Sequence, residues 1–486
     1  MAEAVVASHR TSFEQTAPGS LPDAVHVLRR AGVTERVPFI LAPDGSYDLP
    51  LNRFIRELPE WGVKSENGVS GYCSDIMLIC RFLHEARGGK SIWQMDGDDL
   101  RAYKQARLFA ADPDDRIKES TWGRAMAALD KWVRWSLYEG LLEKEPFRYV
   151  DKTVMTAQGA KQIRVIAEGE VEWHREPITF VPYEEYLLWR DVGLLGCLPG
   201  GGPDPKWRGR NGERNALFAD LLVCTGMRLG EASSLLVPEL PTLAPERGDL
   251  HLSAAVTKRH RPRTVFMRRQ VLRELHHYLA IERDELVQRR GLGGAYENWE
   301  DPLLVRRANR QAVVVEGAGR SWAYSSIDAD RRRRVVSVDA HGHRPAHCGS
   351  GWARTDSRCG ARPWQSAFRR ANERCAKFGV DLEVHPHTLR HTFAVHMLGL
   401  LLRQTVRAMG MQEDRRFTLA QIKRMLIGNP MRKLQLLLGH AREETVYAYL
   451  DVLDEAQEIV LSALAEWDEQ AAALDQLHVP AARAAL

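Results

Sequence analysis

Apolar residues recur every three to four positions through much of residues 50–150, and no other feature constrains the fold of this chain as strongly. The residues at this spacing are Tyr72, Ile76, Ile79 and Leu83 in one segment, and Trp122, Met126, Leu129, Val133 and Leu137 in another. Ser120 precedes the second series and is a residue type that favours a helix N-cap, while Gly140 and Pro146 mark its end. The pattern predicts a small helical domain.

Shorter patterns predict the remaining secondary structure. Strands are expected on both sides of an Asp-Gly turn in PFILAPDGSYDLP (38–50), and on both sides of a basic turn in HLSAAVTKRHRPRTVFM (251–267). One helix is expected through LFADLLVCTGMRLGEASSLL (217–236), another over 271–289, and a helical region over 366–470. The expected fold class is mainly α with a small β-sheet.

The domain organisation follows from these patterns and from changes in composition. With 486 residues the chain is long enough for two or three domains. The expected divisions are an N-terminal extension (1–48), a helical domain (49–150), a polar linker (151–175), a mixed α/β domain (176–470) interrupted by an insertion or long loop at about 290–365, and a C-terminal tail (471–486).

Composition limits the class of protein. Lys and Arg number 68 against 64 Asp and Glu, so the net charge of +4 does not by itself indicate nucleic acid, although basic residues cluster at 268–270, 305–310 and 331–334. The seven cysteines are scattered with no CxxC pair, which favours reduced thiols in a cytoplasm. No signal peptide and no run of 18 apolar residues is evident, so we expect no membrane partner.

The stretch HPHTLRHTFAVHML (385–398) holds four histidines in a helical pattern. His387 and His391 have the spacing of an HExxH zinc helix, but Thr388 stands where the general base is required and Arg390 would repel a dication. For His391 and His396 we prefer ordinary packing and hydrogen bonding. A second possible zinc cluster, whose spacing matches no common pattern, consists of His341, His343, His347, Cys348 and Cys359; the alternative there is a flexible basic loop. We expect no metal site and no cofactor.

An anion is the better ligand for these segments. His387 and Arg390 are three residues apart on one helical face, and an Arg side chain forks two hydrogen bonds onto phosphate oxygens. In CTGMRLGEASSLL (224–236), Arg228 follows the small-residue turn at Gly226, and Glu231 is close enough to steady it. The alternatives are an Arg390 paired with a distant carboxylate and a simple local ion pair at Arg228.

A third segment, LLLGHAREETVYAYLDV (436–452), carries a histidine and two tyrosines. Gly439 allows His440 to leave the preceding helix sharply. Tyr449 lies nine residues after His440, and Tyr447 differs from it by about 200° around a helix, so only one of the two should face a site shared with His440.

Together these segments resemble the tyrosine recombinase (phage integrase) family. The matching pieces are TGMRLGE, a basic β-turn with Lys258, HTLRH, LGH and a tyrosine nine residues later, in family order over roughly 215–455. The region 50–150, ending in YEGLLEKEPF, resembles the family's core-binding (SAM-like) domain. The interval from Arg390 to His440 is longer than in the compact family pattern, and LLRQTVRAMGMQEDRRFTLAQIKRM resembles an insertion.

The resemblance implies a role for each matching residue. Tyr449 would be the nucleophile, Arg228 and Arg390 would clamp the scissile phosphate, and Glu231 would support Arg228. Lys258 would protonate the leaving 5′ oxygen, with Arg259, Arg261 and Arg263 crowded around it. His387 would be the general acid/base, and His440 would hydrogen-bond the phosphate.

The implied protein is a site-specific DNA recombinase, an integrase or transposase of a mobile element, that forms a 3′-phosphotyrosyl intermediate. The implied architecture is a C-shaped clamp on double-stranded DNA recombination sites. The implied assembly is a dimer on one site and a tetramer in the synapse, with accessory proteins as possible partners, in the bacterial cytoplasm with the nucleoid. Three alternatives stay open: a type IB topoisomerase, a catalytically silent DNA-binding protein on the same fold, and a metal-dependent hydrolase built on the histidines.

Overall fold

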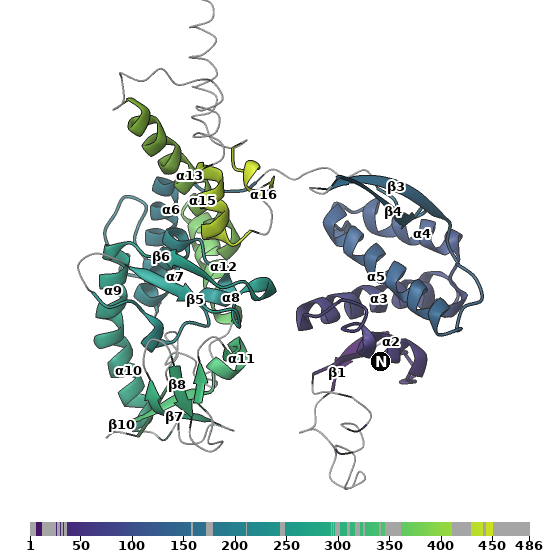
Figure 1. Ribbon diagram of the computed structural model, residues 1–486, viewed down its shortest axis with the longest axis horizontal. Helices are drawn as coiled ribbons and strands as arrows, with labels where there is room; N and C mark the ends of the chain where they lie inside the picture. Colours follow the sequence, from purple (N-terminus) through teal and green to yellow (C-terminus); the bar gives the residue numbers. More distant parts are fainter. Residues whose placement is uncertain are drawn as a thin grey trace, which may run out of the picture. The chain divides into compact units, whose positions relative to one another are not determined.

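The protein is described here from a computed structural model. It describes residues 6–11, 26, 30, 33, 36–156, 159–171, 178–209, 211–243, 248–292, 294, 296, 302–308, 312–315, 321–323, 326–339, 342–345, 361–410, 429–440 and 444–450. The chain divides into two compact units, residues 1–176 and 177–486. Within each unit helices predominate and the sheets are small (Figure 1), so the expected fold class is confirmed.

The first unit is built around a helical core. Its helices and strands are β1 (Ala7–Arg10), β2 (Pro38–Leu41), α2 (Leu49–Glu57), α3 (Glu66–Ala86), α4 (Gly97–Leu108), α5 (Glu119–Tyr138), β3 (Tyr149–Thr156) and β4 (Gly159–Ile166). The predicted apolar faces of α3 and α5 form the centre of this core, where Ile76, Ile79, Trp122 and Leu129 are fully buried. Burying each such side chain stabilises the fold by about 1.5–3 kcal/mol.

Two local predictions in this unit are wrong. The residues after the Asp44–Gly45 turn form no second strand: β2 pairs with β1 instead, and α2 begins at Leu49 because the Asp48 carboxylate accepts a hydrogen bond from the Leu51 N–H (2.9 Å). Helix α5 begins before Ser120, with Lys118 as its N-cap residue.

The expected polar linker at 151–175 instead contains most of an antiparallel hairpin. Strands β3 and β4 pair from Tyr149 with Ile166 to Thr156 with Gly159. The segment that follows is held to the helices, since the Trp122 indole donates to the carbonyl oxygen of Gly169 (2.7 Å). The described hairpin side chains are largely exposed, so the sequence lacks the apolar alternation that identifies a half-buried strand.

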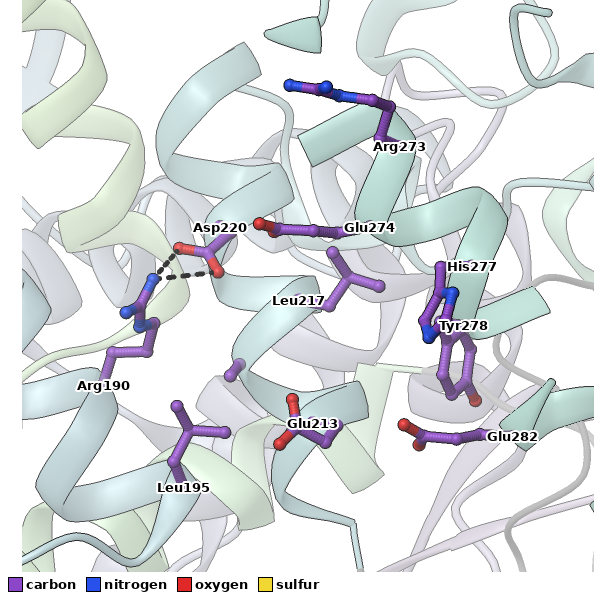
Figure 2. A pocket seen from close by; sticks show the side chains of 11 residues that line it. Arg190, Leu195, Glu213, Leu217, Asp220, Arg273, Glu274, His277, Tyr278 and Glu282 are labelled. Atoms are coloured by element: carbon purple, nitrogen blue, oxygen red, sulfur yellow. Dashed lines mark hydrogen bonds and ion pairs between the residues drawn. The ribbon is translucent and has the colours of Figure 1, made fainter. Parts of the chain in front are cut away.

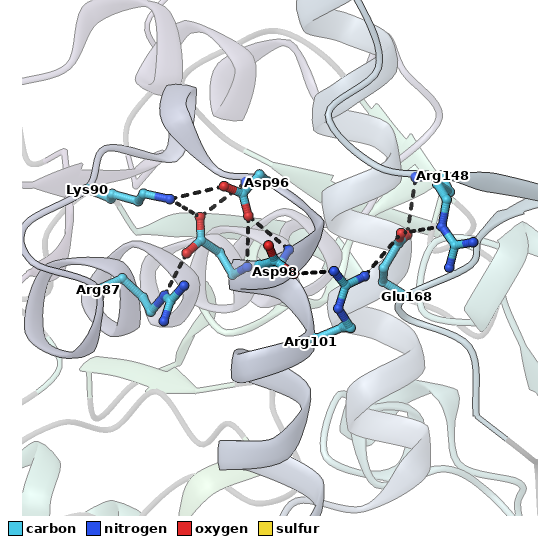
Figure 3. Close-up of polar contacts among 8 residues, drawn as sticks. Arg87, Lys90, Asp96, Asp98, Arg101, Arg148 and Glu168 are labelled. Carbon is cyan, nitrogen blue, oxygen red and sulfur yellow. Dashed lines mark hydrogen bonds and ion pairs between the residues drawn. The ribbon is translucent and has the colours of Figure 1, made fainter.

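A buried carboxylate joins α3 to α4 in the first unit (Figure 3). The Asp99 side chain is fully buried and accepts hydrogen bonds from Arg87 Nε (2.6 Å) and Lys90 Nζ (2.8 Å). It also accepts from the backbone N–H of Asp96, completing a capping box at the start of α4. Burial acts to raise the pKa of Asp99, but these hydrogen bonds more than offset it, so its pKa is below the ordinary value.

The second unit carries the remaining elements. They are α6 (Tyr183–Trp189), a π-helical turn (Arg190–Leu195), α7 (Gly212–Thr225), α8 (Leu229–Ala232), β5 (Asp249–Leu252), β6 (Arg263–Phe266), α9 (Arg269–Ala280), α10 (Glu282–Gly291), β7 (Leu303–Ala308), β8 (Ala312–Val315), β9 (Ser321–Ala323), α11 (Ala329–Arg332), β10 (Val335–Asp339), β11 (Gly342–Pro345), α12 (Ala361–Lys377), α13 (Pro386–Gly410), α15 (Asn429–Leu438) and α16 (Glu444–Tyr447).

Helix α7 lies at the centre of the main core of this unit, and every residue from Arg214 to Thr225 is buried. A helix with no exposed face is surrounded by its neighbours, and apolar residues of α6, α9, α12, β5 and β6 share the same cluster. A separate cluster joins α13, α15 and the turn around Tyr449. The predicted strands over 251–267 are confirmed as the antiparallel pair β5–β6.

The expected insertion or long loop at 290–365 contains a five-stranded sheet of order β11-β10-β7-β8-β9, which lies at one end of the unit in Figure 1. The buried Arg332 fixes this region to the rest of the unit: its guanidinium donates to Glu239 (2.6 Å) and to Ser253 Oγ (3.1 Å). Short strands separated by Gly- and Arg-rich stretches gave no pattern long enough to predict them.

Among the described helices, none combines the length and the apolar character needed to span a bilayer.

Candidate active site

Arg228 follows a break between two helices. Gly226 ends α7 in the left-handed conformation (φ +63°), and a Cβ atom at this position would lie 2.3 Å from the Phe393 ring of α13. Glycine alone adopts this left-handed conformation readily and also leaves room for the Phe393 ring. The single helix expected over 217–236 is therefore wrong, and the break makes Arg228 the N-cap residue of α8.

Glu231 is a buried carboxylate that binds two arginines. It accepts hydrogen bonds from the backbone N–H of Arg228 (2.8 Å), from Arg228 Nη1 (3.2 Å), and from Arg263 Nη1 (2.9 Å) and Nη2 (2.6 Å). Its burial opposes ionisation, but the hydrogen bonds and charge of Arg263 and Arg228 hold its pKa below the ordinary value. The predicted contact between Glu231 and Arg228 is present, and Arg263 adds a stronger one.

Arg263 connects three segments of the site. It is the first residue of β6, five positions after Lys258, and its side chain is almost completely buried. Besides the two bonds to Glu231, its Nε donates to the carbonyl oxygen of Leu437 in α15 (3.0 Å). One guanidinium therefore fixes the basic turn, the Arg228 segment and the helix that precedes His440 relative to one another.

Arg390 is a buried cation beside neutral acceptors. It is 1% exposed and donates to the carbonyl oxygens of Gly226 and Leu438, at the C-terminal ends of α7 and α15. Such carbonyls carry partial negative charge. Burial and the charges of Arg228 and Arg263 lower the pKa of Arg390 to about 9, so it stays cationic at pH 7. Among the described residues the nearby carboxylate, Glu231, forms its ion pairs with Arg228 and Arg263 and not with Arg390.

Tyr449, in the turn that follows α16, lies in the same region as Arg390. It is 2% exposed, and its Oη lies 3.0 Å from Nδ1 of His391. Burial raises the pKa of Tyr449, while the charges of Arg390 and Arg228 act in the opposite direction. Tyr447 is 38% exposed, so the expectation that the two tyrosines face opposite ways is confirmed.

Two imidazoles, His391 and His440, contact this phenol, and a third, His387, contacts His391. The rings of His387 and His391 meet edge to face with centroids 4.4 Å apart, and the ring of His440 stacks on Tyr449 at 6.4 Å. His440 Nδ1 shares a hydrogen bond with Thr445 Oγ1 (3.0 Å). Burial and neighbouring positive charges lower the pKa of both His391 and His440 to about 4, so both rings are neutral at pH 7.

Lys258 and His387 form the exposed side of the cluster. Lys258 lies in a 3₁₀ turn (Lys258–His260) between β5 and β6, with its side chain in solvent. Partial burial, followed by the charges of Arg390, Arg228 and Lys258, lowers the pKa of His387. Lys258 is therefore within electrostatic range of the cluster.

All six residues predicted for the site thus lie around one region of the second unit: Arg228, Lys258, His387, Arg390, His440 and Tyr449. Two functional neighbours were missed. Arg263 was noted only as one of several arginines near Lys258. His391 was expected to serve ordinary packing and hydrogen bonding; it does form a hydrogen bond, but its partner is Tyr449. The sequence shows neither contact because each joins segments far apart in the chain.

The described residues contain no cluster of three or more His, Cys, Asp or Glu side chains that could hold a metal ion. The possible zinc cluster at 341–359 falls outside the described side chains. The site consists of guanidinium, imidazole, ammonium and phenol groups, a set suited to an anion.

A separate cavity of about 490 Å³ in this unit does not include the site (Figure 2). Its polar lining mixes both signs of charge, with Glu213, Asp220, Glu274 and Glu282 beside Arg190 and Arg273. Arg190 already pairs with Asp220 at 3.1 Å.

Comparison with known proteins finds a family match over part of the chain. Residues 51–140, which lie in the first unit, match the family described as phage integrase, N-terminal SAM-like domain. No curated protein sequence matches the chain.

Solved structures similar to the chain include two recombinases and an integrase. The XerH site-specific recombinase bound to difH substrate shares 14% identity, covering 92% of this chain and 91% of its own, with a TM-score of 0.41. XerA recombinase shares 15% identity over 85% of this chain and 97% of its own, with a TM-score of 0.31. A lambda integrase dimer bound to a COC′ core site shares 12% identity, covering 82% of this chain and 93% of its own, with a TM-score of 0.40.

Proposed function

We propose that this protein is a tyrosine-type site-specific DNA recombinase, an integrase or transposase of a mobile element, with Tyr449 as its nucleophile. The observation that supports the proposal best is the position of the Tyr449 phenol, which lies 3.0 Å from His391 and stacks with His440, close enough to Arg390 and Arg228 for their charges to act on it. The phage integrase SAM-like domain at 51–140 supports DNA as the substrate.

Two guanidiniums meet the main requirement of phosphoryl transfer. Free tyrosine has a pKa of about 10, so ionising it at pH 7 costs about 4 kcal/mol. In this site burial raises the pKa of Tyr449 further, while the positive charges of Arg390 and Arg228 act in the opposite direction. Both side chains donate to oxygens on which negative charge grows in the transition state, and this electrostatic stabilisation lowers the barrier without a metal ion.

The remaining groups complete the proposed reaction. Tyr449 Oη attacks the phosphorus and the bond to the 5′ oxygen breaks, while Lys258 gives that oxygen a proton. His440 donates a hydrogen bond to the phosphate, and His387 exchanges protons at the exposed side of the site. The products are a 3′-phosphotyrosyl link and a free 5′ hydroxyl, so the energy of the phosphodiester is kept for rejoining with another strand.

DNA binding would use both units, and affinity would come mainly from contacts with phosphates. Strand exchange between two sites needs four copies of Tyr449, so the proposed assembly is a dimer on each site and a tetramer in the synapse. Accessory proteins and a bacterial nucleoid location belong to the same proposal.

The test is covalent trapping on nicked duplexes that carry the sequence flanking the protein's own gene. We expect the wild type and Tyr447→Phe to form a protein–DNA adduct in EDTA, and Tyr449→Phe to bind the same DNA without forming one. If Tyr449→Phe formed an adduct and Tyr447→Phe did not, Tyr449 would not be the nucleophile and our assignment would be wrong.

Other outcomes distinguish the alternatives. A strict need for a divalent metal would favour a hydrolase. Relaxation of DNA lacking any specific site, without strand exchange, would favour a type IB topoisomerase. DNA binding with no adduct under any condition would favour a silent DNA-binding protein.

A further inference from the structure

His391 forms a hydrogen bond with Tyr449 Oη, the oxygen that attacks the phosphate in the proposed reaction. The mechanism proposed above assigns no role to His391. We propose that His391 Nδ1 accepts the phenolic proton of Tyr449 when the phenol attacks the phosphate, so that His391 is a catalytic residue. This inference rests on the proposed function and assigns to His391, rather than His387, the step that activates the nucleophile.

The geometry supplies the first support. Helix α13 begins at Pro386, and its first turns carry His387, Arg390 and His391. Nδ1 of His391 lies 3.0 Å from Tyr449 Oη, with ring centroids 5.7 Å apart, so the proton has a direct path between the two atoms. Among the described residues no hydrogen bond joins His387 to this phenol.

The direction of the hydrogen bond follows from burial. Tyr449 is 2% exposed, and a buried uncharged phenol must place its proton on an acceptor. His391 is partly buried, and burial together with the charges of His387 and Arg390 keeps its ring neutral at pH 7. A neutral ring has one acceptor nitrogen. Nδ1 is therefore the acceptor, and Nε2 carries the ring proton.

His387 is placed for a different task. Its side chain is exposed, and its surroundings are the cations Lys258, Arg228 and Arg390 rather than the phenol. The edge-to-face contact at 4.4 Å joins the exposed His387 ring to the partly buried His391 ring. The histidine pair thus divides the work: His391 faces the nucleophile and His387 faces the phosphate and water.

The proton balance is complete without any co-reactant. The Oη–P bond forms and the O–H bond of Tyr449 breaks, with its proton moving to His391 Nδ1. The P–O5′ bond breaks, and Lys258 gives its proton to the 5′ oxygen. The new imidazolium lies beside Arg390 and is stabilised by the negative phosphate. In the resealing step, the attacking 5′ hydroxyl returns a proton to Lys258, the Oη–P bond breaks, and His391 returns its proton to the departing phenolate.

The matched variants are His391→Gln and, as a control, His396→Gln. His396 lies on the same helix, five residues on, with its ring exposed and stacked against Tyr183. On the nicked duplex described above, at single turnover, we expect His391→Gln to form adduct about 10²–10⁴-fold more slowly at pH 7 with unchanged DNA affinity. The deficit should shrink tenfold per pH unit as rising pH ionises the phenol, because hydroxide then removes the proton. His396→Gln should match the wild type.

A second substrate separates activation of the nucleophile from activation of the leaving group. A duplex with sulfur in place of the 5′ bridging oxygen has a leaving group that needs no protonation. It should restore cleavage by Lys258→Ala and leave the defect of His391→Gln in place. The inference would be overturned if the sulfur substrate restored cleavage by His391→Gln, or if His391→Gln cleaved the ordinary duplex at the wild-type rate. In either case the proposed function would stand. If the wild-type protein never forms an adduct, both fail.

A measurement on the wild-type protein tests the inference even if the His391→Gln variant does not fold. In full-length protein with ¹⁵N-labelled histidine, Nδ1 of His391 should show the shift of an unprotonated, hydrogen-bonded ring nitrogen at pH 7, and Tyr449→Phe should move it. A protonated Nδ1 would refute the assignment.

Discussion

Replacing Arg263 by methionine tests how far one buried ion pair holds the site together. The substitution keeps most of the apolar stem but removes the two hydrogen bonds to Glu231 (2.9 and 2.6 Å) and the one to the Leu437 carbonyl (3.0 Å). Breaking a buried pair by removing one partner costs about 3–5 kcal/mol. Arg228 still binds Glu231, so we expect a loss near the lower end, about 3 kcal/mol.

The assay is urea unfolding of the full chain. Arg289→Met is the matched control, because Arg289 pairs with Glu285 on the surface of the same unit, with both side chains more than 60% exposed. Such a pair contributes about 0–1 kcal/mol. The double variant Arg263→Met/Glu231→Gln should recover part of the loss, because it no longer buries an uncompensated charge.

The difference in unfolding free energy between the wild type and Arg263→Met should also depend on pH. In the wild type the pKa of Glu231 is depressed, so its contribution to stability is present above the unfolded pKa and is lost as pH falls through the folded pKa. Without Arg263, burial raises the pKa of Glu231, and the deficit of the variant should shrink between pH 7 and 5. A cost below about 1 kcal/mol, or a double variant no more stable than the single one, would refute the claim that Arg263 organises the site.

Three further predictions concern other parts of the molecule. Asp99→Asn should lower the unfolding free energy by about 2 kcal/mol, because Arg87 and Lys90 lose a charged acceptor; in the wild type this contribution is lost as pH falls through the depressed pKa of Asp99, and an unfolding series across pH 3–7 would measure both effects. Gly226→Ala should cost about 2–4 kcal/mol, from its positive φ and the collision with Phe393, and equal stability by urea unfolding would contradict it. DNA affinity should fall steeply between 50 and 200 mM salt, and a salt-independent binding isotherm would exclude phosphate contacts as its main source.

The sequence predicted the parts of the fold that depend on short-range patterns. The 3.6-residue period located α3 and α5 because one helical face must be apolar to pack, and Trp122 and Leu129 are fully buried as that pattern requires. The left-handed Gly439 follows from the same kind of local argument. The hairpin at 149–166 and the sheet within 303–345 were missed, because exposed or short strands leave no such period.

What the sequence by itself determined was the set of chemical groups and their order along the chain: two arginines, a lysine, two histidines and a tyrosine in segments that resemble one family. What only the tertiary structure decided was their partners. Arg263 reaches Glu231 across 32 residues, and His391 reaches the Tyr449 phenol across 58. Local propensity depends on neighbours a few positions away, whereas these contacts depend on how α7, β6, α13 and α15 pack. That packing is set by a buried core whose pairings no short stretch of the sequence encodes.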